Sequence, residues 1–277
     1  MLFDSHAHIN NNTYTQEERE ALIREIEASD LSYVMDIGFD IISSRLAVEH
    51  SRKLPWCYAA VGVHPHDAKT MSEEILDEIE KLTQNEKVKA IGEIGLDFHY
   101  DRSERDVQEY WFRKQIRLAN KLHMPIVIHS RDADQRTMDI LKEEGAFSVE
   151  RMSWFPERQG EIPGKKEKDA RVLLHCFSGS KELGKEYVKM GATLSVAGPV
   201  TYKNNHKTVE MAEKIPIEYL LIETDSPYLT PVPFRGKPNK PIYVEHTARR
   251  IAVIKNMPYE EVAERTLKNA KVFFDIK

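Results

Sequence analysis

Two histidines one residue apart stand at the end of the first hydrophobic stretch, in the segment L-F-D-S-H-A-H-I-N at residues 2–10. Side chains alternate across a β-strand, so Asp4, His6 and His8 are expected on one face. Two imidazoles at one strand end can bind the same metal ion, and Asp4 could orient one of them as a hydrogen-bond acceptor. The spacing alone is a weak signal, because a chain with 11 histidines often contains such a pair by chance.

Histidines and carboxylates also follow other short hydrophobic runs that have the length and composition of buried strands. They are His64 and His66 in G-V-H-P-H, Glu93 in G-E-I-G-L-D, His129 in P-I-V-I-H-S-R, His175 in L-L-H-C-F-S-G and Asp225 in E-T-D-S-P. One such residue at a strand end is usually structural. Their occurrence at the ends of six of eight predicted strands indicates a metal site.

His64 and His66 could be ligands, acid catalysts or loop caps. The expected ligands are four imidazoles from these strand ends and the two carboxylates Glu93 and Asp225. This set exceeds what one ion with an open position needs, so we expect two divalent ions roughly 3.5–4 Å apart, bridged by Glu93. Such ions lower the pKa of a bound water to about 7, and Asp225 can accept its proton. Hydrolysis is therefore expected, with Glu93 and Asp225 as catalytic residues. Imidazoles favour zinc or manganese and oxygens favour magnesium, so the metal stays open.

The elements that must position these residues are short strands alternating with amphipathic helices. Apolar runs predict strands at 1–8, 32–38, 57–63, 88–94, 125–129, 171–176, 192–197 and 218–223. A capping box at Thr15 begins one helix, Ser72 precedes a second with Ile75, Ile79 and Leu82 at helical spacing, and a long helix is expected over 103–122. This order predicts one α/β domain over residues 1–277, a (β/α)8 TIM-like barrel. In that fold the C-terminal ends of the strands meet on one face, where active sites lie.

Residues 145–170 interrupt this alternation and make the connection before the sixth strand unusually long. The segment contains Trp154 and Phe155 beside Arg151 and Arg158, a mixture that could stack on an unpaired base. Its five basic and five acidic residues cancel, so it attracts no polyanion. An inserted surface excursion is favoured, and a lid over the substrate is the alternative.

Composition describes an ordinary soluble protein, with 41% hydrophobic and 31% charged residues and a net charge of -5. Because there is no overall positive field, a nucleic acid would have to be held by local cations or by metal. No apolar run has the length of a membrane span and no leader precedes the first strand, so we expect a cytoplasmic protein with Cys57 and Cys176 as free thiols. Strand alternation places Cys176 toward the helices. No feature indicates an obligate protein partner.

Seven motifs occur in order along nearly the whole chain: F-D-S-H-A-H-I-N, G-V-H-P-H, G-E-I-G-L-D, P-I-V-I-H-S-R-D-A, H-C-F-S-G, E-T-D-S-P-Y-L and R-G-K-P-N-K-P. Together they resemble the TatD family of metal-dependent hydrolases, within the amidohydrolase superfamily. Glu93 stands where many amidohydrolases have a carboxylated lysine, which favours the TatD branch. The chain departs from the family at Gln135, where an acidic residue is common, and at 145–170.

This resemblance implies a TIM-like barrel and His64 as a substrate contact. The divalent pair that it implies is held by His6, His8, Glu93, His129, His175 and Asp225. It also implies magnesium-dependent deoxyribonuclease activity, often from a 3′ end, although one branch of the family removes D-amino acids from mischarged tRNA. Arg131, Lys203 and Arg235 are candidates for binding the phosphates beside the scissile bond, although each could be a solvated surface charge. His66 is expected to be structural.

The leading interpretation is therefore a metal-dependent deoxyribonuclease acting on DNA ends. Deacylation of D-aminoacyl-tRNA is the alternative, because an activated water attacks either phosphorus or a carbonyl carbon. The complete ligand set argues against a binding module that has lost catalysis. The G-E-I-G-L-D and E-T-D-S-P motifs disfavour a phosphoesterase of the polymerase-and-histidinol-phosphatase type.

Overall fold

In the computed structural model, which describes residues 1–277, eight parallel strands form one sheet in the order β1-β2-β3-β4-β5-β8-β9-β10. The strands are β1 (Leu2–Ala7), β2 (Leu31–Ile37), β3 (Cys57–Val61), β4 (Val88–Asp97), β5 (Ile126–Arg131), β8 (Val172–Leu174), β9 (Thr193–Val196) and β10 (Leu220–Ile222). Each predicted strand is present, with bounds shifted by no more than a few residues. The predicted α/β class and TIM-like barrel are confirmed.

The barrel nearly closes where β1 meets the segment that follows β10. The backbone amide of His8 donates to the carbonyl oxygen of Ser226 at 2.9 Å, and the amide of Asp225 donates to that of His6 at 2.9 Å. Only an isolated parallel bridge, rather than a full ladder, joins the two strands here. Closure therefore occurs at the same residues that were predicted to bind metal.

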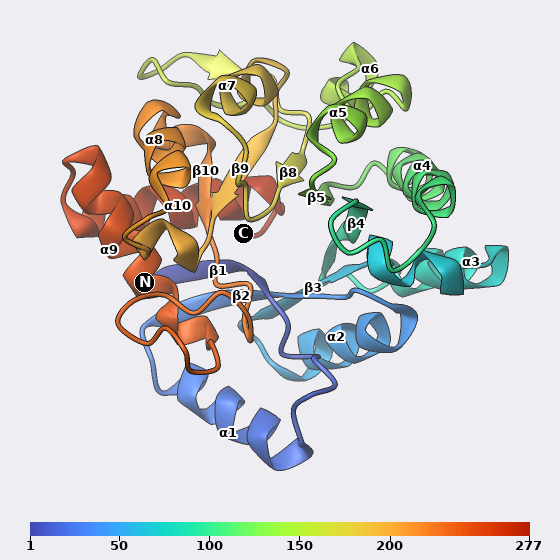
Figure 1. The fold of residues 1–277 in the computed structure, drawn as a ribbon, viewed down its shortest axis with the longest axis horizontal. Coiled ribbons are helices and arrows are strands. Elements are labelled where there is room, and N and C mark those ends of the chain that lie inside the picture. Colours follow the sequence, from blue (N-terminus) through green and yellow to red (C-terminus); the bar gives the residue numbers. More distant parts are fainter.

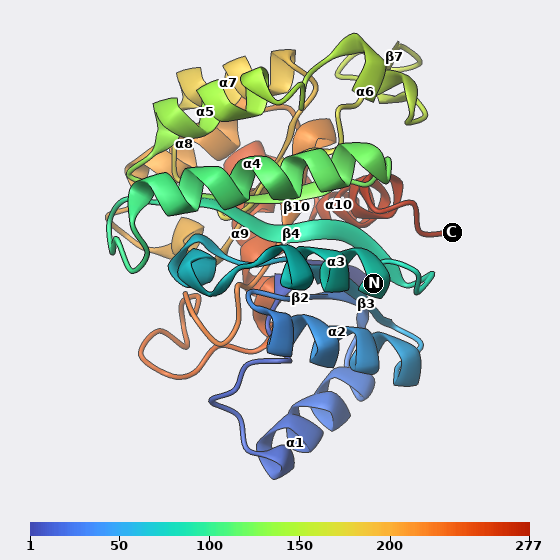
Figure 2. The ribbon, with the colours of Figure 1, turned by 90° about the vertical axis from the view of Figure 1, so that its right-hand side faces the viewer.

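Helices follow the strands and cover the outside of the barrel (Figures 1 and 2). The α-helices are α1 (Gln16–Glu27), α2 (Ile41–Lys53), α3 (Glu73–Leu82), α4 (Arg105–Lys121), α5 (Asp134–Glu143), α6 (Val149–Ser153), α7 (Lys181–Lys189), α8 (His206–Lys214), α9 (Val244–Lys255) and α10 (Tyr259–Phe273). Short 3-10 helices are η1 (Pro65–Thr70), η2 (Gly198–Thr201), η3 (Ile217–Tyr219) and η4 (Pro241–Tyr243). The predicted capping box at Thr15 is confirmed, and the structure shows that Ser72 caps α3. None of the helices combines the length and apolar character that crossing a bilayer requires.

Alternation along the strands separates two hydrophobic clusters. In β3, for example, Ala59 and Val61 belong to the cluster between sheet and helices, whereas Ala60 belongs to a smaller cluster. The smaller cluster takes residues from seven of the eight strands and fills the barrel interior. Phe273 and Phe274, at the end of α10, complete it. The interior is therefore a packed core, and chemistry is possible only at the barrel ends.

Residues 145–170 pack at the N-terminal ends of the strands. They contain α6 and a small antiparallel pair, β6 (Arg158–Gln159) and β7 (Lys166–Glu167), which lie together at one edge in Figure 2. The buried Arg158 donates to Thr193 Oγ1, at the start of β9, at 2.6 Å. The buried Arg151 donates to the carbonyl oxygen of Met124, just before β5, at 2.8 Å. The lid interpretation is wrong, because the predicted metal site lies at the opposite end of the barrel.

The aromatic residues of this segment are used within the fold. The Trp154 ring is stacked on His123 with centroids 4.2 Å apart. The guanidinium groups of Arg171 and Arg151 lie 5.1 and 5.4 Å from the Phe155 ring centroid. These contacts fasten the segment to the barrel and hold Trp154 at the end of the barrel opposite the predicted metal site.

Glu93 lies in β4 between glycines that allow a close approach to β5. At Gly95, with φ 148°, an added Cβ would stand 1.9 Å from the carbonyl oxygen of His129. At Gly92, with φ 159°, an added Cβ would stand 2.7 Å from Val127 Cβ. The missing side chains let β4 and β5 bring Glu93 and His129 together.

We expect Gly95→Ala to lower the free energy of unfolding by roughly 3 kcal/mol or more, because both the backbone angle and the clash with a neighbouring strand oppose a side chain. Gly164→Ala is the matched control, since Gly164 has φ 81° with no atom within 4 Å of the added carbon. It should cost only about 1–2 kcal/mol. Urea denaturation followed by circular dichroism measures both values. Equal losses would contradict a role for the close approach at Gly95.

Candidate metal centre

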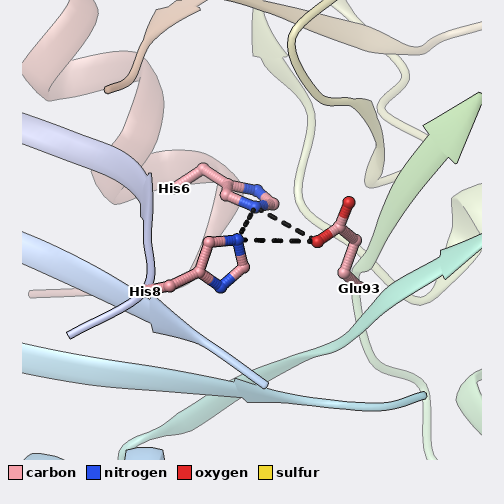
Figure 3. Close-up of side chains that lie close together, drawn as sticks. All are labelled: His6, His8 and Glu93. Atoms are coloured by element: carbon pink, nitrogen blue, oxygen red, sulfur yellow. Dashed lines mark hydrogen bonds and ion pairs between the residues drawn. The ribbon is translucent and has the colours of Figure 1, made fainter. Parts of the chain in front are cut away.

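His6 and His8, at the end of β1, converge with Glu93 of β4 (Figure 3), and Asp225 joins them at the C-terminal end of the barrel. His6 Nε2 lies 3.3 Å from His8 Nε2 and 3.4 Å from Glu93 Oε2. Asp225 Oδ1 lies 3.4 Å from His8 Nε2 and 3.8 Å from His6 Nε2. The side chains of His6, His8 and Glu93 are buried, and that of Asp225 is 15% exposed. Asp225 is therefore the member of this group that solvent reaches most easily.

A second group of imidazoles faces the other oxygen of Glu93. His175 Nε2 lies 2.8 Å and His129 Nδ1 lies 2.9 Å from Glu93 Oε1. His64, predicted as a substrate contact, is buried within this group, with its Nε2 3.5 Å from the same oxygen. The Glu93 carboxylate thus lies between two sets of imidazole nitrogens.

This donor set fits divalent cations. His8 Nδ1 lies 2.8 Å from the carbonyl oxygen of Ile37, which can only accept, so Nδ1 carries a proton and Nε2, which faces His6, is the nitrogen free to bind a metal. Buried lone pairs and carboxylate oxygens this close repel one another unless positive charge lies among them. Three triads have donor atoms within 4.8 Å of one another: His6–His8–Glu93, His6–His175–Glu223 and His64–Glu93–His129. The number of ions and the assignment of ligands stay predictions.

The charges of the central groups follow from their surroundings. Burial alone would raise the pKa of Glu93, but the charge of His175 and a hydrogen bond from His129 hold it well below its ordinary value. Burial, with the nearby His129, lowers the pKa of His64 well below its ordinary value. Glu93 is therefore an anion and His64 a neutral imidazole at pH 7. Against the effect of burial, Glu93 and the neighbouring Glu223 raise the pKa of His175, so a cation that binds there must displace a proton.

Two carboxylates that were not predicted from the sequence lie against the outer nitrogens of His129 and His175. Asp97 Oδ2 lies 3.1 Å from His129 Nε2, and Glu223 Oε1 lies 3.3 Å from His175 Nδ1. Both carboxylates are buried. Such contacts fix which ring nitrogen carries the proton and aim the other one at the metal. Asp97 and Glu223 could have been found from the sequence by their places in the motifs G-E-I-G-L-D and E-T-D-S-P, which also contain predicted ligands.

The remaining partners of these carboxylates fix them in turn. Asp97 Oδ2 also lies 2.9 Å from His66 Nε2, so the expectation that His66 is structural agrees with its contacts. Ser195 donates its hydroxyl to Glu223 Oε2 at 2.5 Å. Each outer carboxylate therefore has a second partner besides the imidazole that it orients.

The prediction that Asp4 orients an imidazole is wrong. Its carboxylate accepts from the amide and hydroxyl of Thr224 at 2.9 and 2.6 Å, and from the backbone amide of His6 at 3.3 Å. Asp4 therefore fastens β1 to the segment after β10. Asp4 positions His6 and Asp225 through the backbone and not through an imidazole, because its oxygens accept hydrogen bonds from Thr224.

The prediction that Cys176 faces the helices is also wrong. Strand β8 ends at Leu174, and Cys176 has φ 44°, so strand alternation no longer determines its direction. Burial raises the pKa of its thiol, and the nearby carboxylates Glu223 and Asp225 raise it further. Cys176 therefore lies beside the candidate metal centre, and both cysteines are free thiols as predicted.

The three predicted phosphate-binding cations are exposed side chains on the same end of the barrel. Arg131 is the last residue of β5, and its guanidinium carbon lies 4.7 Å from the ring centroid of Tyr100. Lys203 follows η2, and the Arg235 guanidinium carbon lies 4.3 Å from the ring centroid of Tyr202. The structure brings these cations to the rim, and none of them enters the buried cluster.

The fold and this centre together define a (β/α)8 barrel hydrolase with a histidine–carboxylate site at the C-terminal ends of its strands. Residues 3–275 match the family described as TatD related DNase. The chain is 44% identical to the "Uncharacterized metal-dependent hydrolase YabD" of Bacillus subtilis, with 100% of each chain covered. It thus belongs to the TatD family and is a metal-dependent hydrolase.

Two further relatives extend the comparison. The crystal structure of YJJV, a TatD homologue from Escherichia coli, matches with a TM-score of 0.84 at 25% identity, covering 100% of this chain and 98% of that one. The protein named "3'-5' ssDNA/RNA exonuclease TatD" of Pantoea vagans is 28% identical, with 99% of each chain covered. Fold and family therefore extend over the full length of the chain.

We expect Asp97→Asn and Glu223→Gln each to weaken divalent-metal affinity about 10- to 100-fold, because each removes the charge that orients an imidazole. Asp36→Asn is the matched control, since buried Asp36 makes a similar 2.7 Å contact with His50 outside the cluster. Competition with a chromogenic chelator measures the affinities. Equal weakening in all three variants would show a general loss of stability rather than loss of ligand orientation.

Proposed function

We propose that this metal-dependent hydrolase is a deoxyribonuclease that removes nucleotides from the 3′ end of single-stranded DNA. The observation that carries the proposal is the Glu93 carboxylate set between two groups of imidazole nitrogens, below a rim with exposed cations. The name of the Pantoea vagans relative supports nucleic acid as the substrate. The family description supports DNA.

Divalent ions would be held by the six predicted ligands: His6, His8, His129, His175, Glu93 and Asp225. When bound, they would polarise the scissile phosphate and lower the pKa of water at the site. Asp97 and Glu223 keep the imidazoles aimed at this point. The packed barrel interior below the cluster confines solvent to the open side.

Side chains of the protein carry out proton transfer and phosphate binding. Asp225, which is partly exposed, takes the proton of the attacking water, because it is the carboxylate of the cluster nearest the solvent. Arg131, Lys203 and Arg235 bind the phosphates on either side of the scissile bond through charge-assisted hydrogen bonds. Their distribution over two separate parts of the rim suits a chain of nucleotides better than one small ester.

We expect Asp225→Asn to reduce the rate constant for release of nucleotides from 3′-labelled single-stranded DNA by about 10²- to 10⁴-fold, because the proton acceptor is lost. Removal of metal with a chelator should abolish turnover, and added divalent metal should restore it. D-aminoacyl-tRNA serves as the competing substrate. Release of the amino acid from it, with DNA left intact, would replace the nuclease proposal with deacylation.

We expect Lys203→Ala and Arg235→Ala to weaken the binding of single-stranded DNA and to reduce the slope of log affinity against log salt by about 0.7 each, because each loses one phosphate contact. Lys268→Ala is the control, since Lys268 is an exposed lysine on α10, away from the rim. Fluorescence anisotropy over a salt series measures both quantities. A slope that none of the variants changes would remove these side chains from the binding site.

A further inference from the structure

An exposed tyrosine stands beside the metal centre. Tyr100, in the loop after β4, is 50% exposed, and its ring centroid lies 5.5 Å from that of His66. Exposure by itself means little, because single exposed aromatics are common. Tyr110, on the outer surface of α4, is exposed to the same degree at 49%. Two further observations distinguish Tyr100 from Tyr110.

The first observation is that the Tyr100 loop is fastened to the metal centre. The backbone amides of His99 and Tyr100 donate to Asp97 Oδ1 at 3.0 and 2.9 Å. The other oxygen of this carboxylate faces His129 Nε2 at 3.1 Å. One buried carboxylate therefore fixes both a proposed ligand and the backbone of Tyr100. A group that binds on the Tyr100 ring is held at a defined distance from the centre.

The second observation is that two arginines lie against the Tyr100 ring. The guanidinium carbons of Arg131 and Arg102 are 4.7 and 5.4 Å from the ring centroid. Both arginines are exposed. A guanidinium that packs on an aromatic ring is held in place, and its planar N–H groups can still donate to a phosphate. The cluster thus combines an aromatic surface with two cations, which is the composition of sites that bind single-stranded nucleic acids.

We infer that Tyr100, Arg131 and Arg102 form a subsite for one unpaired nucleotide next to the scissile phosphate. The base stacks on the surface made by Tyr100 and its arginines, and a guanidinium binds the adjacent phosphate. This inference rests on the proposed nuclease function. A base inside a duplex is already stacked on its neighbours and cannot reach the Tyr100 ring. The subsite therefore makes the enzyme prefer single-stranded DNA.

The test compares Tyr100→Ala with Tyr100→Phe and with the equally exposed control Tyr110→Ala, using the metal-loaded enzyme and a short single-stranded oligonucleotide. Tyr100→Ala should raise KM roughly 5- to 150-fold with little change in kcat, because stacking on one base is lost. Tyr100→Phe should retain the wild-type KM, since its ring still stacks. Tyr110→Ala should also retain it. A general structural defect would lower kcat as well.

The substrate provides a second, independent measurement. Replacing single nucleotides of the oligonucleotide by abasic ones should raise KM at one position near the cleaved end in the wild-type enzyme. The same replacement should have no further effect in Tyr100→Ala, which is the coupling expected of two groups in contact. The KM values of the wild-type enzyme with the abasic oligonucleotides test the subsite even if Tyr100→Ala fails to fold.

Two results would overturn the subsite. One is an unchanged KM in a folded Tyr100→Ala, and the other is a wild-type KM that does not depend on the position of the abasic nucleotide. In both cases cleavage by the wild-type enzyme would leave the proposed nuclease function standing. Failure of the wild-type enzyme to cleave any oligonucleotide would overturn the proposed function, and the subsite with it.

Discussion

Glu93 is a buried carboxylate with five imidazoles within 3.7 Å of its oxygens. An anion with only 4% exposure needs positive charge or hydrogen-bond donors around both oxygens, because burial removes it from solvent. The groups that surround it come from the ends of β1, β5 and β8 and from the loop after β3, so four separate segments must end at one point. Barrel closure at His6 and Asp225, and the close approach of β4 to β5 at Gly95, are the backbone conditions for that convergence.

A surrounding layer of carboxylates holds this point in place. Asp97 and Glu223 hold the outer nitrogens of His129 and His175, whereas Asp4 acts on the backbone that joins β1 to the segment after β10. Each has a second partner, so no side chain of the layer is oriented by one contact alone. Rigid support of this kind keeps metal-binding nitrogens aimed correctly before an ion arrives, which reduces the cost of binding it.

The two ends of the barrel have different tasks. At the N-terminal end, buried Arg151 and Arg158 bond to residues beside the starts of β5 and β9, so the long segment 145–170 contributes to stability. At the C-terminal end, the loop after β4 carries both Asp97, which supports a proposed ligand, and exposed Tyr100. A change in this loop can therefore affect metal binding and substrate binding together, whereas a change in 145–170 acts through folding.

Local patterns in the sequence were enough to predict the strand order, the class of fold and the six residues that meet at the centre. Hydrophobic runs define strands, and parallel strands bring their C-terminal ends to one face. The partners of Asp97, Glu223 and Asp4, the direction of Cys176, and the end of the barrel at which 145–170 packs could not be predicted in this way. Asp4 and Thr224 are 220 residues apart, and Cys176 lies past its strand with φ 44°. Contacts between distant segments, and side-chain directions beyond a strand's end, are set by how the whole chain packs, which local periodicity does not encode.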